Sequence, residues 1–128
     1  MTYALTIRCN NYCLRNAALQ QEVPGSILNF TRKLIALRKE NPALRRGDFV
    51  PLTLAPRDAL IYLRRTDEQT VLVALNFSRR LVGTLYATPL LQTNDWRLLF
   101  STARDDLPRI SADGIELVPY EVCLLVTP

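Results

Sequence analysis

The sequence predicts a mainly β fold: an antiparallel Greek-key β-sandwich preceded by one amphipathic α-helix. Apolar residues recur at helical spacing between Ser26 and Pro42, and after Gly47 short runs of β-branched and aromatic residues alternate with turn residues. Short strands separated by turns roughly every 8–12 residues are typical of sandwiches and barrels. A chain of 128 residues is long enough for one domain that folds without disulfides or metals.

The predicted helix begins after Ser26 and ends before Pro42. Ser26 can cap its first turn, and Pro42 forces the preceding residue out of the helical region. The apolar positions span an arc of roughly 180°, whereas a surface helix on one sheet needs only about 100°. These positions are Ile27, Leu28, Phe30, Leu34, Ile35 and Leu37. We therefore expect two contact surfaces on this helix.

Strands are expected at residues 49–55, 59–65, 70–78, 81–87, 96–102 and 114–127. The first stretch contains Pro51, which suits an edge strand, and the last is expected to bend at Pro119. Residues 70–78 are apolar at both odd and even positions. We therefore expect them to form a central strand that is covered on both faces.

The residue types exclude several kinds of chemistry. The absence of histidine removes Ser-His and Cys-His nucleophile pairs, imidazole metal sites and the commonest general base. The cysteines Cys9, Cys13 and Cys123 are odd in number and irregular in spacing, which favours free thiols over disulfides or zinc. We expect no metal and no cofactor.

The acidic residues are expected to have structural roles. Most lie in predicted turns, where Asp caps backbone N–H groups, namely Asp48, Asp58, Asp67, Glu68, Asp105, Asp106 and Asp113. The adjacent pair at 105–106 could bind calcium, but a single pair without further spaced oxygen ligands favours a solvated loop. Glu116 and Glu121 lie on the last predicted strands and should point to opposite faces because their spacing is odd.

The net charge of +4 comes largely from arginine, including the pairs at 45–46, 64–65 and 79–80. These pairs lie at strand edges or turns, and neither an aromatic RNA-binding motif nor a helix-turn-helix pattern accompanies them. We therefore expect solvated turns and no nucleic-acid partner. No apolar run approaches the roughly 20 residues that span a bilayer, and Arg8 lies where a signal peptide has its apolar centre. We expect no membrane association and a cytoplasmic location.

Aromatic side chains are the residues here that could bind sugar. Trp96 shares strand parity with Leu98 and Phe100 and is expected in the core, where its indole N–H needs a partner. Tyr62 and Tyr86 are expected to be partly exposed and are the candidate sugar-contacting residues. Two scattered tyrosines make a weak platform for a sugar ring, so a structural role is favoured.

Several motifs follow one another in order from Asn16 onward. They are NAALQ at 16–20, PGS at 24–26, LNFTRKLIALR at 28–38, ENPALRRGDF at 40–49, VLVALNFS at 71–78 and LVPYEVCLLV at 117–126. Together they resemble the C-terminal part of the α-amylase superfamily of glycoside hydrolases, in its α-glucosidase, oligo-1,6-glucosidase and trehalose-synthase branch. The pattern departs from the family at Val23, where Asp is usual, and at Thr31, where Tyr is common.

The resemblance implies the last helix of a (β/α)₈ barrel, followed by a C-terminal β-sandwich in which Asn76 and Phe77 are buried at a strand end. It divides the chain into an unassigned segment 1–15, a barrel helix with its linker at 16–47, and the sandwich at 48–128. The family's catalytic Asp and Glu lie on barrel strands without counterparts in this sequence. The resemblance therefore implies no catalytic residue here and a non-catalytic accessory domain that stabilises a glycoside hydrolase of α-glucosidase type.

The implied partner is the barrel catalytic domain, which this sequence does not contain and which the helix would meet through Ile27, Phe30, Leu34 and Leu37. Two alternatives stay open. One is a carbohydrate-binding module that takes α-glucans at Tyr62 and Tyr86. The other is a protein-interaction domain that forms a homodimer through the same helix.

Overall fold

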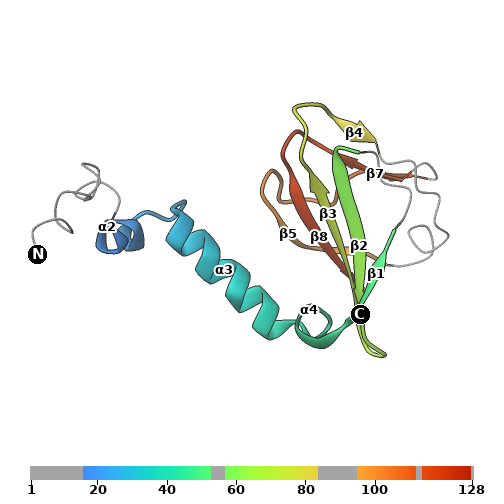
Figure 1. Ribbon diagram of the computed structural model, residues 1–128, viewed down its shortest axis with the longest axis horizontal. Coiled ribbons are helices and arrows are strands. Elements are labelled where there is room, and N and C mark those ends of the chain that lie inside the picture. The colour runs from blue at the N-terminus through green and yellow to red at the C-terminus, as the bar shows by residue number, and fades with distance from the viewer. Residues whose placement is uncertain (1–15, 53–56, 84–94, 112–113, 128) are drawn as a thin grey trace, which may run out of the picture. The chain divides into compact units, whose positions relative to one another are not determined.

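The computed structural model describes residues 16–52, 57–83, 95–111 and 114–127 (Figure 1). The chain divides into two compact units, Met1–Glu40 and Asn41–Pro128. The described part of the first unit is helical, and the second unit holds the sheets. The predicted fold class, mainly antiparallel β with a preceding helix, is confirmed.

The described part of the first unit contains helices α2 (Ala17–Glu22) and α3 (Ile27–Glu40). α3 confirms the predicted helix and its cap, since the Ser26 Oγ accepts a hydrogen bond from Asn29 N at 3.3 Å. α2 begins after Asn16, whose side chain accepts a hydrogen bond from Leu19 N at 2.9 Å. Among the helices that the structure describes, none is long and apolar enough to cross a membrane.

Polar side chains fix the turn between α2 and α3. The Ser26 hydroxyl donates a hydrogen bond to the Gln20 carbonyl oxygen at 2.6 Å. Asn29 Nδ2 lies 3.0, 3.1 and 2.8 Å from the carbonyl oxygens of Gln20, Gln21 and Val23. The last carbonyls of a helix have no partner inside that helix, so the Asn29 amide caps the end of α2.

The described residues of the second unit form two antiparallel sheets. The five-stranded sheet has the order β1-β2-β3-β8-β5 and the three-stranded sheet the order β4-β7-β6. The large sheet consists of β1 (Asp48–Pro51), β2 (Ala59–Arg65), β3 (Thr70–Asn76), β5 (Arg97–Ser101) and β8 (Val122–Thr127). The small sheet consists of β4 (Val82–Gly83), β6 (Ile110–Ser111) and β7 (Gly114–Leu117). β3 is the central strand of the large sheet, as predicted.

The strands alternate between the sheets in a Greek-key manner. The chain leaves the large sheet after β3, returns to it as β5, and enters it a last time as β8 between β3 and β5 (Figure 1). β4, β6 and β7 lie in the small sheet. The strand pairings of the described residues are all antiparallel, as the short runs between turns indicated.

The side chains between the two sheets form one hydrophobic core. Its buried members are Ile61, Leu63, Leu72, Ala74, Trp96, Ile115, Leu117, Cys123 and Leu125. Ile115 and Leu117 come from β7 in the small sheet, so the cluster joins the two sheets. The predicted core position of Trp96 is confirmed, but its indole Nε1 has no hydrogen-bond partner among the described residues because apolar side chains surround it.

A β-bulge in β5 corrects the expectation that Phe100 shares a face with Trp96 and Leu98. Leu98 pairs with Leu125 and Phe100 pairs with Leu124, so the register shifts between them. Consecutive residues of β8 point to opposite faces, and directly paired residues share a face. Leu98 therefore packs against the core, whereas Phe100 lies on the other side of the sheet.

Some boundaries differ from the prediction. β1 begins at Asp48, which was expected in a turn, and helix α4 (Pro42–Arg46) and strand β6 were not predicted. Both elements are too short for a periodic pattern. Of the resembling family's buried Asn-Phe pair, Asn76 is 3% exposed but Phe77 is 62% exposed. β3 ends at Asn76, so Phe77 lies beyond the strand and outside the core.

A buried ion pair lies at the corner where the chain passes from β7 to β8. Glu121 is 0% exposed, and its Oε1 and Oε2 accept hydrogen bonds from Arg104 Nε and Nη2, each at 2.7 Å. Ser101 Oγ donates to Oε1 at 2.9 Å and Val118 N donates to Oε2 at 2.8 Å. The hydrogen bonds to Glu121 raise the pKa of the Arg104 guanidinium above its ordinary value. Glu121 thus lies in a turn rather than on a strand. The prediction that Glu116 and Glu121 both lie on strands and point to opposite faces is therefore wrong.

A second buried polar side chain, Asn76, holds the same corner from β3. Its Nδ2 donates hydrogen bonds to the carbonyl oxygens of Val118 and Arg80, both at 2.9 Å. Its Oδ1 accepts from Ser78 N at 2.9 Å, and its backbone N–H donates to the Glu121 carbonyl oxygen at 2.9 Å. Asn76 therefore satisfies backbone groups of two loops that the sheets leave unpaired.

The corner contains a backbone conformation that is unusual for its residue. Tyr120 has φ 55°, in the left-handed region, and its side chain is 61% exposed. Pro119 precedes it, and Glu121 N donates to the Val118 carbonyl oxygen at 3.2 Å, as in a type II turn that favours glycine at the third position. Tyr120 N also donates to the Ser78 carbonyl oxygen at 3.1 Å, so the surrounding bonds hold the strained residue in place.

Replacing Glu121 with Gln should lower the free energy of unfolding by about 3 kcal/mol, because Arg104 would lose its charged partner. The value lies at the lower end of the range for buried pairs since the Arg104 side chain keeps 17% exposure. Urea titration of the variant measures the loss. Arg109→Met, at an exposed arginine, is the control and should change stability by less than about 0.5 kcal/mol. Equal losses in the two variants would contradict a special role for the ion pair.

Tyr120→Gly should stabilise the protein by about 1 kcal/mol because glycine adopts positive φ without the steric cost that tyrosine incurs. Tyr120→Ala is the matched control, since it removes the exposed ring but keeps the strain. Thermal unfolding should rank the glycine variant above both the alanine variant and the parent. A glycine variant less stable than the alanine variant would show that the turn is not strained.

Cys123 should be nearly inert to thiol reagents in the folded protein, because burial raises its pKa from 9.0 to about 12. The Cys9→Ser/Cys13→Ser variant leaves this thiol alone, and at pH 8 its thiolate population should be about 1,000-fold below that of an unfolded thiol. The same shift makes stability fall as pH rises from 9.0 toward 12, since only the unfolded chain then releases the proton. Labelling at equal rates in buffer and in denaturant would place Cys123 outside the core.

Candidate functional site

The acidic residues of the described ranges are mostly exposed, and the buried one, Glu121, serves a structural contact. Asp105 and Asp106 are exposed in the bend after β5, and the Glu121 carboxylate is bound by Arg104. Among the residues that the structure describes, no group of three or more His, Cys, Asp or Glu side chains could hold a metal ion. The calcium alternative at 105–106 therefore gains no further oxygen ligand from the described acids.

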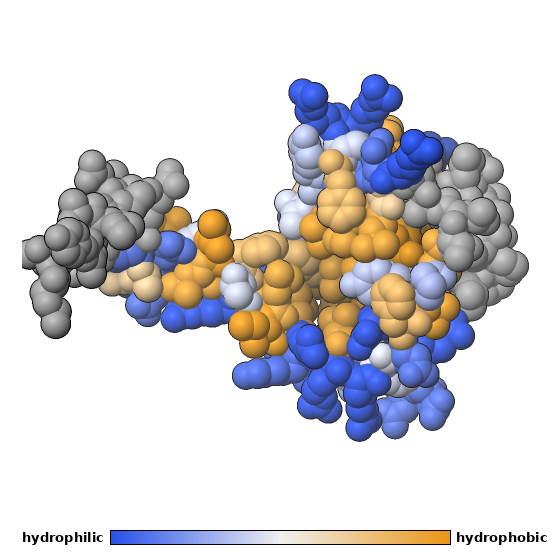
Figure 2. Space-filling view, viewed as in Figure 1, coloured by the Kyte–Doolittle hydropathy of each residue, from blue (hydrophilic) through white to orange (hydrophobic). Residues whose placement is uncertain are grey.

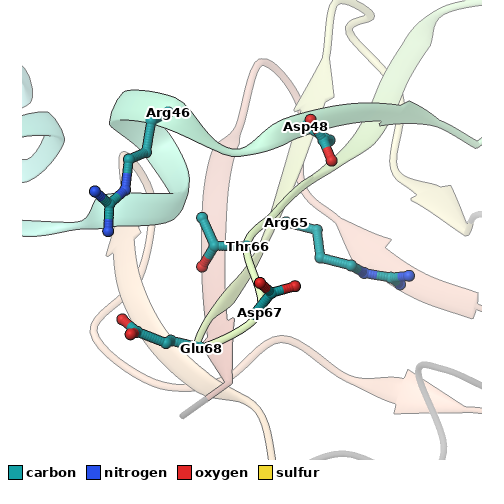
Figure 3. Close-up of a pocket in the computed structure, with 6 residues that line it drawn as sticks. All are labelled: Arg46, Asp48, Arg65, Thr66, Asp67 and Glu68. Carbon is teal, nitrogen blue, oxygen red and sulfur yellow. The ribbon is translucent and has the colours of Figure 1, made fainter.

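A shallow pocket lies between the end of α4 and the turn that joins β2 to β3 (Figure 3). It has a volume of about 290 Å³ and is lined by Arg46, Asp48, Arg65, Thr66, Asp67 and Glu68. Figure 3 shows the Arg46 and Arg65 side chains pointing in opposite directions and the carboxylates of Asp48, Asp67 and Glu68 spread around the pocket. Glycoside hydrolysis requires two carboxyl groups that flank one bond, and these side chains do not converge in that way.

Of the two candidate sugar-contacting residues, the structure describes Tyr62, whereas Tyr86 lies outside the described residues. Tyr62 is half-buried on β2, and its ring centroid lies 4.8 Å from that of Phe49 at an interplanar angle of 41°. This contact with Phe49 uses part of the surface that a flat sugar platform would need. Sugar contact at these two tyrosines stays a prediction.

The four candidate interface residues of the helix lie along one side of α3. Their spacing of three, four and three residues brings them to the same stripe of an α-helix. Ile27 is 78% exposed and Phe30 38% exposed, while Leu34 and Leu37 are half-buried. The stripe offers apolar surface of the kind that an interface needs. An interface at this stripe stays a prediction.

The large sheet has a second apolar face, on the side away from the core, which we call the outer face. Directly paired residues of an antiparallel ladder share a face, so the register identifies its members. They are Phe49, Pro51, Leu60, Tyr62, Arg64, Val71, Val73, Leu75, Arg97, Phe100, Val122, Leu124 and Val126. All of these except Arg64 and Arg97 are uncharged, and most are aliphatic or aromatic.

Helix α4 covers one end of the outer face. Its Ala43 is 0% exposed, and the Ala43 carbonyl oxygen accepts a hydrogen bond from Arg64 Nε at 3.4 Å. Gln69 Oε1 accepts from Ala43 N at 3.2 Å, which fixes the start of α4 to the β2–β3 turn. Gly47 permits the tight exit from α4, because a Cβ there would lie 2.9 Å from Arg65 N. Val71, on this end of the outer face, is consequently 0% exposed.

The opposite end of the outer face reaches the surface. Leu60 is 42% exposed, and its cross-strand neighbours Leu75 and Val122 are half-buried. Figure 2 shows hydrophobic side chains across the middle of the second unit, between hydrophilic upper and lower margins. Sequence reasoning anticipated this face only for β3, whose residues are apolar on both sides.

Comparison with known proteins identifies relatives over most of the chain. No family model matches it. Palatinase of Erwinia rhapontici is 36% identical over 108 residues, which are 83% of this chain and 19% of palatinase. The amino acid transporter heavy chain SLC3A2 of Mus musculus is 33% identical over 120 residues, which are 85% of this chain and 23% of the transporter subunit.

Shorter matches include a trehalose synthase and an oligo-1,6-glucosidase, which are the kinds of protein that the motifs resemble. The trehalose synthase of Thermus thermophilus is 37% identical over 70 residues, 54% of this chain and 7% of the synthase. A probable oligo-1,6-glucosidase of Bacillus subtilis is 35% identical over 69 residues, 54% of this chain and 12% of that protein. The predicted resemblance is confirmed.

Solved structures show the same fold. The trehalulose synthase MutB of Pseudomonas mesoacidophila MX-45 matches with a TM-score of 0.71 and 28% identity, over 93% of this chain and 21% of the synthase. The chain spans about a fifth of the length of palatinase and of MutB, 19% and 21%. It therefore belongs to the α-amylase family, as the counterpart of one region of these longer proteins.

Proposed function

We propose that this chain acts as a non-catalytic accessory domain that stabilises the catalytic barrel of an α-glucosidase-like glycoside hydrolase. The observation that carries the proposal is that the chain's buried polar side chains make contacts within its own fold. The buried polar side chains Glu121 and Asn76 bind other parts of the fold, and the exposed acids in the described ranges do not converge on one point. This use of the described polar groups suits a scaffold better than a retaining glycosidase, which needs two carboxyl groups that flank one bond.

The range of relatives supports the same proposal. Regions similar to this chain occur in a palatinase, a trehalose synthase and a transporter heavy chain. A region shared by proteins whose names describe such different functions is better suited to a common structural task than to one reaction. The proposal includes the predicted division at 47/48, the missing barrel as partner and a cytoplasmic setting.

The stripe on α3 supports a contact with that barrel. Ile27 and Phe30 are large apolar side chains with 78% and 38% exposure, which an isolated surface helix does not need. Self-association through this stripe and α-glucan binding at Tyr62 are the competing functions. Neither is favoured by a contact in the described residues.

A complementation experiment tests the proposal. Palatinase of Erwinia rhapontici would be truncated to lack its matching region and co-expressed with the full 128-residue chain. We expect the chain to raise the soluble yield and the hydrolysis of a chromogenic α-glucoside at least fivefold, because it covers apolar surface that the truncation exposes. A β-sandwich of similar size from outside the family is the control and should give no increase.

Two results would contradict the proposal. Hydrolysis by the purified chain alone would make it an enzyme in its own right. No gain in yield or activity over the control sandwich would remove the accessory role, and calorimetric binding of maltohexaose by the chain would then favour a carbohydrate-binding module.

A further inference from the structure

One exposed aromatic residue of the second unit is held in a backbone conformation that its side chain disfavours. Tyr120 is the one non-glycine residue of the described ranges with a positive φ, and its side chain is 61% exposed. A bulky residue has a steric cost in this region that glycine would avoid. Burial of the ring does not offset the cost, because the ring lies mostly at the surface. Strained residues that persist in a fold are typical of ligand-binding sites.

A second exposed aromatic ring lies in the neighbouring loop. Phe77 directly follows β3 and is 62% exposed. The carbonyl oxygen of the next residue, Ser78, accepts a hydrogen bond from Tyr120 N at 3.1 Å, so the two loops meet at this point. Neither ring contacts another aromatic ring of the described residues, whereas Phe49 and Tyr62 contact each other. Both rings therefore leave surface for a ligand.

Buried Asn76 joins the two loops. Its Nδ2 donates hydrogen bonds to the carbonyl oxygens of Val118 and Arg80, which belong to one loop each, both at 2.9 Å. Phe77 N donates to the Asp58 carbonyl oxygen at 2.7 Å, which fixes the start of the first loop. Since Asn76 is only 3% exposed and bonds both loops, it limits their relative movement. Rings presented from a fixed frame lose less entropy when they bind a ligand.

Hydrogen-bond donors accompany the rings. Arg79 and Arg80 follow Phe77 in the same loop, and both are exposed. Within the part of the chain that the structure describes, neither guanidinium has an ion-pair partner. Each arginine side chain carries five N–H donors, and hydroxyl oxygens accept hydrogen bonds. Aromatic rings beside such donors match a pyranose sugar, which has apolar C–H faces and a rim of hydroxyl groups.

The size of the apolar surface favours a small ligand over a protein partner. Two aromatic side chains at about 60% exposure offer roughly 250 Å². Leu81, which is 58% exposed in the same loop, adds to this area. A specific protein interface buries about 800 Å² on each partner, which is much more than these three side chains supply. A flat ligand that stacks on the two rings needs no larger surface.

We propose that the rings of Tyr120 and Phe77 form a stacking site for an oligosaccharide of α-linked glucose, whose hydroxyl groups accept hydrogen bonds from the neighbouring arginines. The choice of α-linked glucose rests on the proposed function, whereas the position of the site rests on the geometry of the two loops. The site goes beyond the accessory role and differs from the one predicted at Tyr62 and Tyr86.

Calorimetric titration of the full 128-residue chain with maltohexaose tests the site. We expect the parent chain to bind, and Tyr120→Gly and Tyr120→Ala to bind at least about tenfold more weakly because both lack the ring. The glycine variant should nevertheless be the more stable protein, since it relieves the positive φ. Weaker binding by a more stable protein separates the role of the ring from the stability of the fold. Tyr120→Phe keeps the ring and should bind within about threefold of the parent.

The second ring has its own variant and control. Phe77→Ala should weaken binding at least about fivefold, because it removes the other stacking surface. Leu107→Ala changes an apolar residue that is 47% exposed in the loop after β5, and it should bind within about twofold of the parent. Thermal unfolding of each variant shows that it is folded under the conditions of the titration.

The outcomes separate this inference from the accessory function. No binding of maltohexaose by the parent chain, or equal binding by the parent and Tyr120→Gly, would overturn the site while rescue of truncated palatinase could still support the accessory function. Binding that depends on the two rings, without rescue of palatinase, would support the site and refute the accessory function. Loss of rescue by Tyr120→Gly in a chain that does not bind the sugar would assign the ring to a protein contact and overturn the site.

Discussion

The pairing of Arg104 with Glu121 is the constraint on which the arrangement of the two sheets depends. A carboxylate with 0% exposure is stable only if its charge and its lone pairs are satisfied, and here a bidentate arginine, a hydroxyl and a backbone N–H satisfy them. Because Glu121 lies between β7 and β8, fixing its side chain fixes the direction in which the chain leaves the small sheet. Asn76 secures the same corner from β3, so one polar cluster sets the crossing between the layers.

The two faces of the large sheet are covered in different ways. The core lies on one side of the large sheet, together with the buried polar side chains Glu121 and Asn76. The outer face is apolar yet lies partly at the surface, and α4 covers only its Val71 end. The tight exit at Gly47 keeps α4 close to β2, at the end of the outer face where Val71 is buried.

The regular parts of the fold were predictable because they follow a period. The helix α3 follows from apolar residues at helical spacing, and the strands β2 and β3 follow from short apolar runs between turn residues. The central position of β3 follows from its apolar residues at both odd and even positions. The bulge that turns Phe100 away from Leu98, and the pairing of Arg104 with Glu121 across seventeen positions, depend on tertiary contacts without any period. One signal was available: Glu121 is the acidic residue within the otherwise uncharged stretch 117–126, where a solvated carboxylate is unexpected.

The placement of β8 has a consequence for how the protein is made. This strand lies between β3 and β5, so the large sheet lacks an inner member until residues 122–127 have left the ribosome. Until then the edges of β3 and β5 are unpaired and prone to pair with other chains. The helical pair α2 and α3, whose contacts are local in sequence, can form much earlier during synthesis. A nascent chain that stalls before Val122 should therefore depend on chaperones that bind unpaired strands.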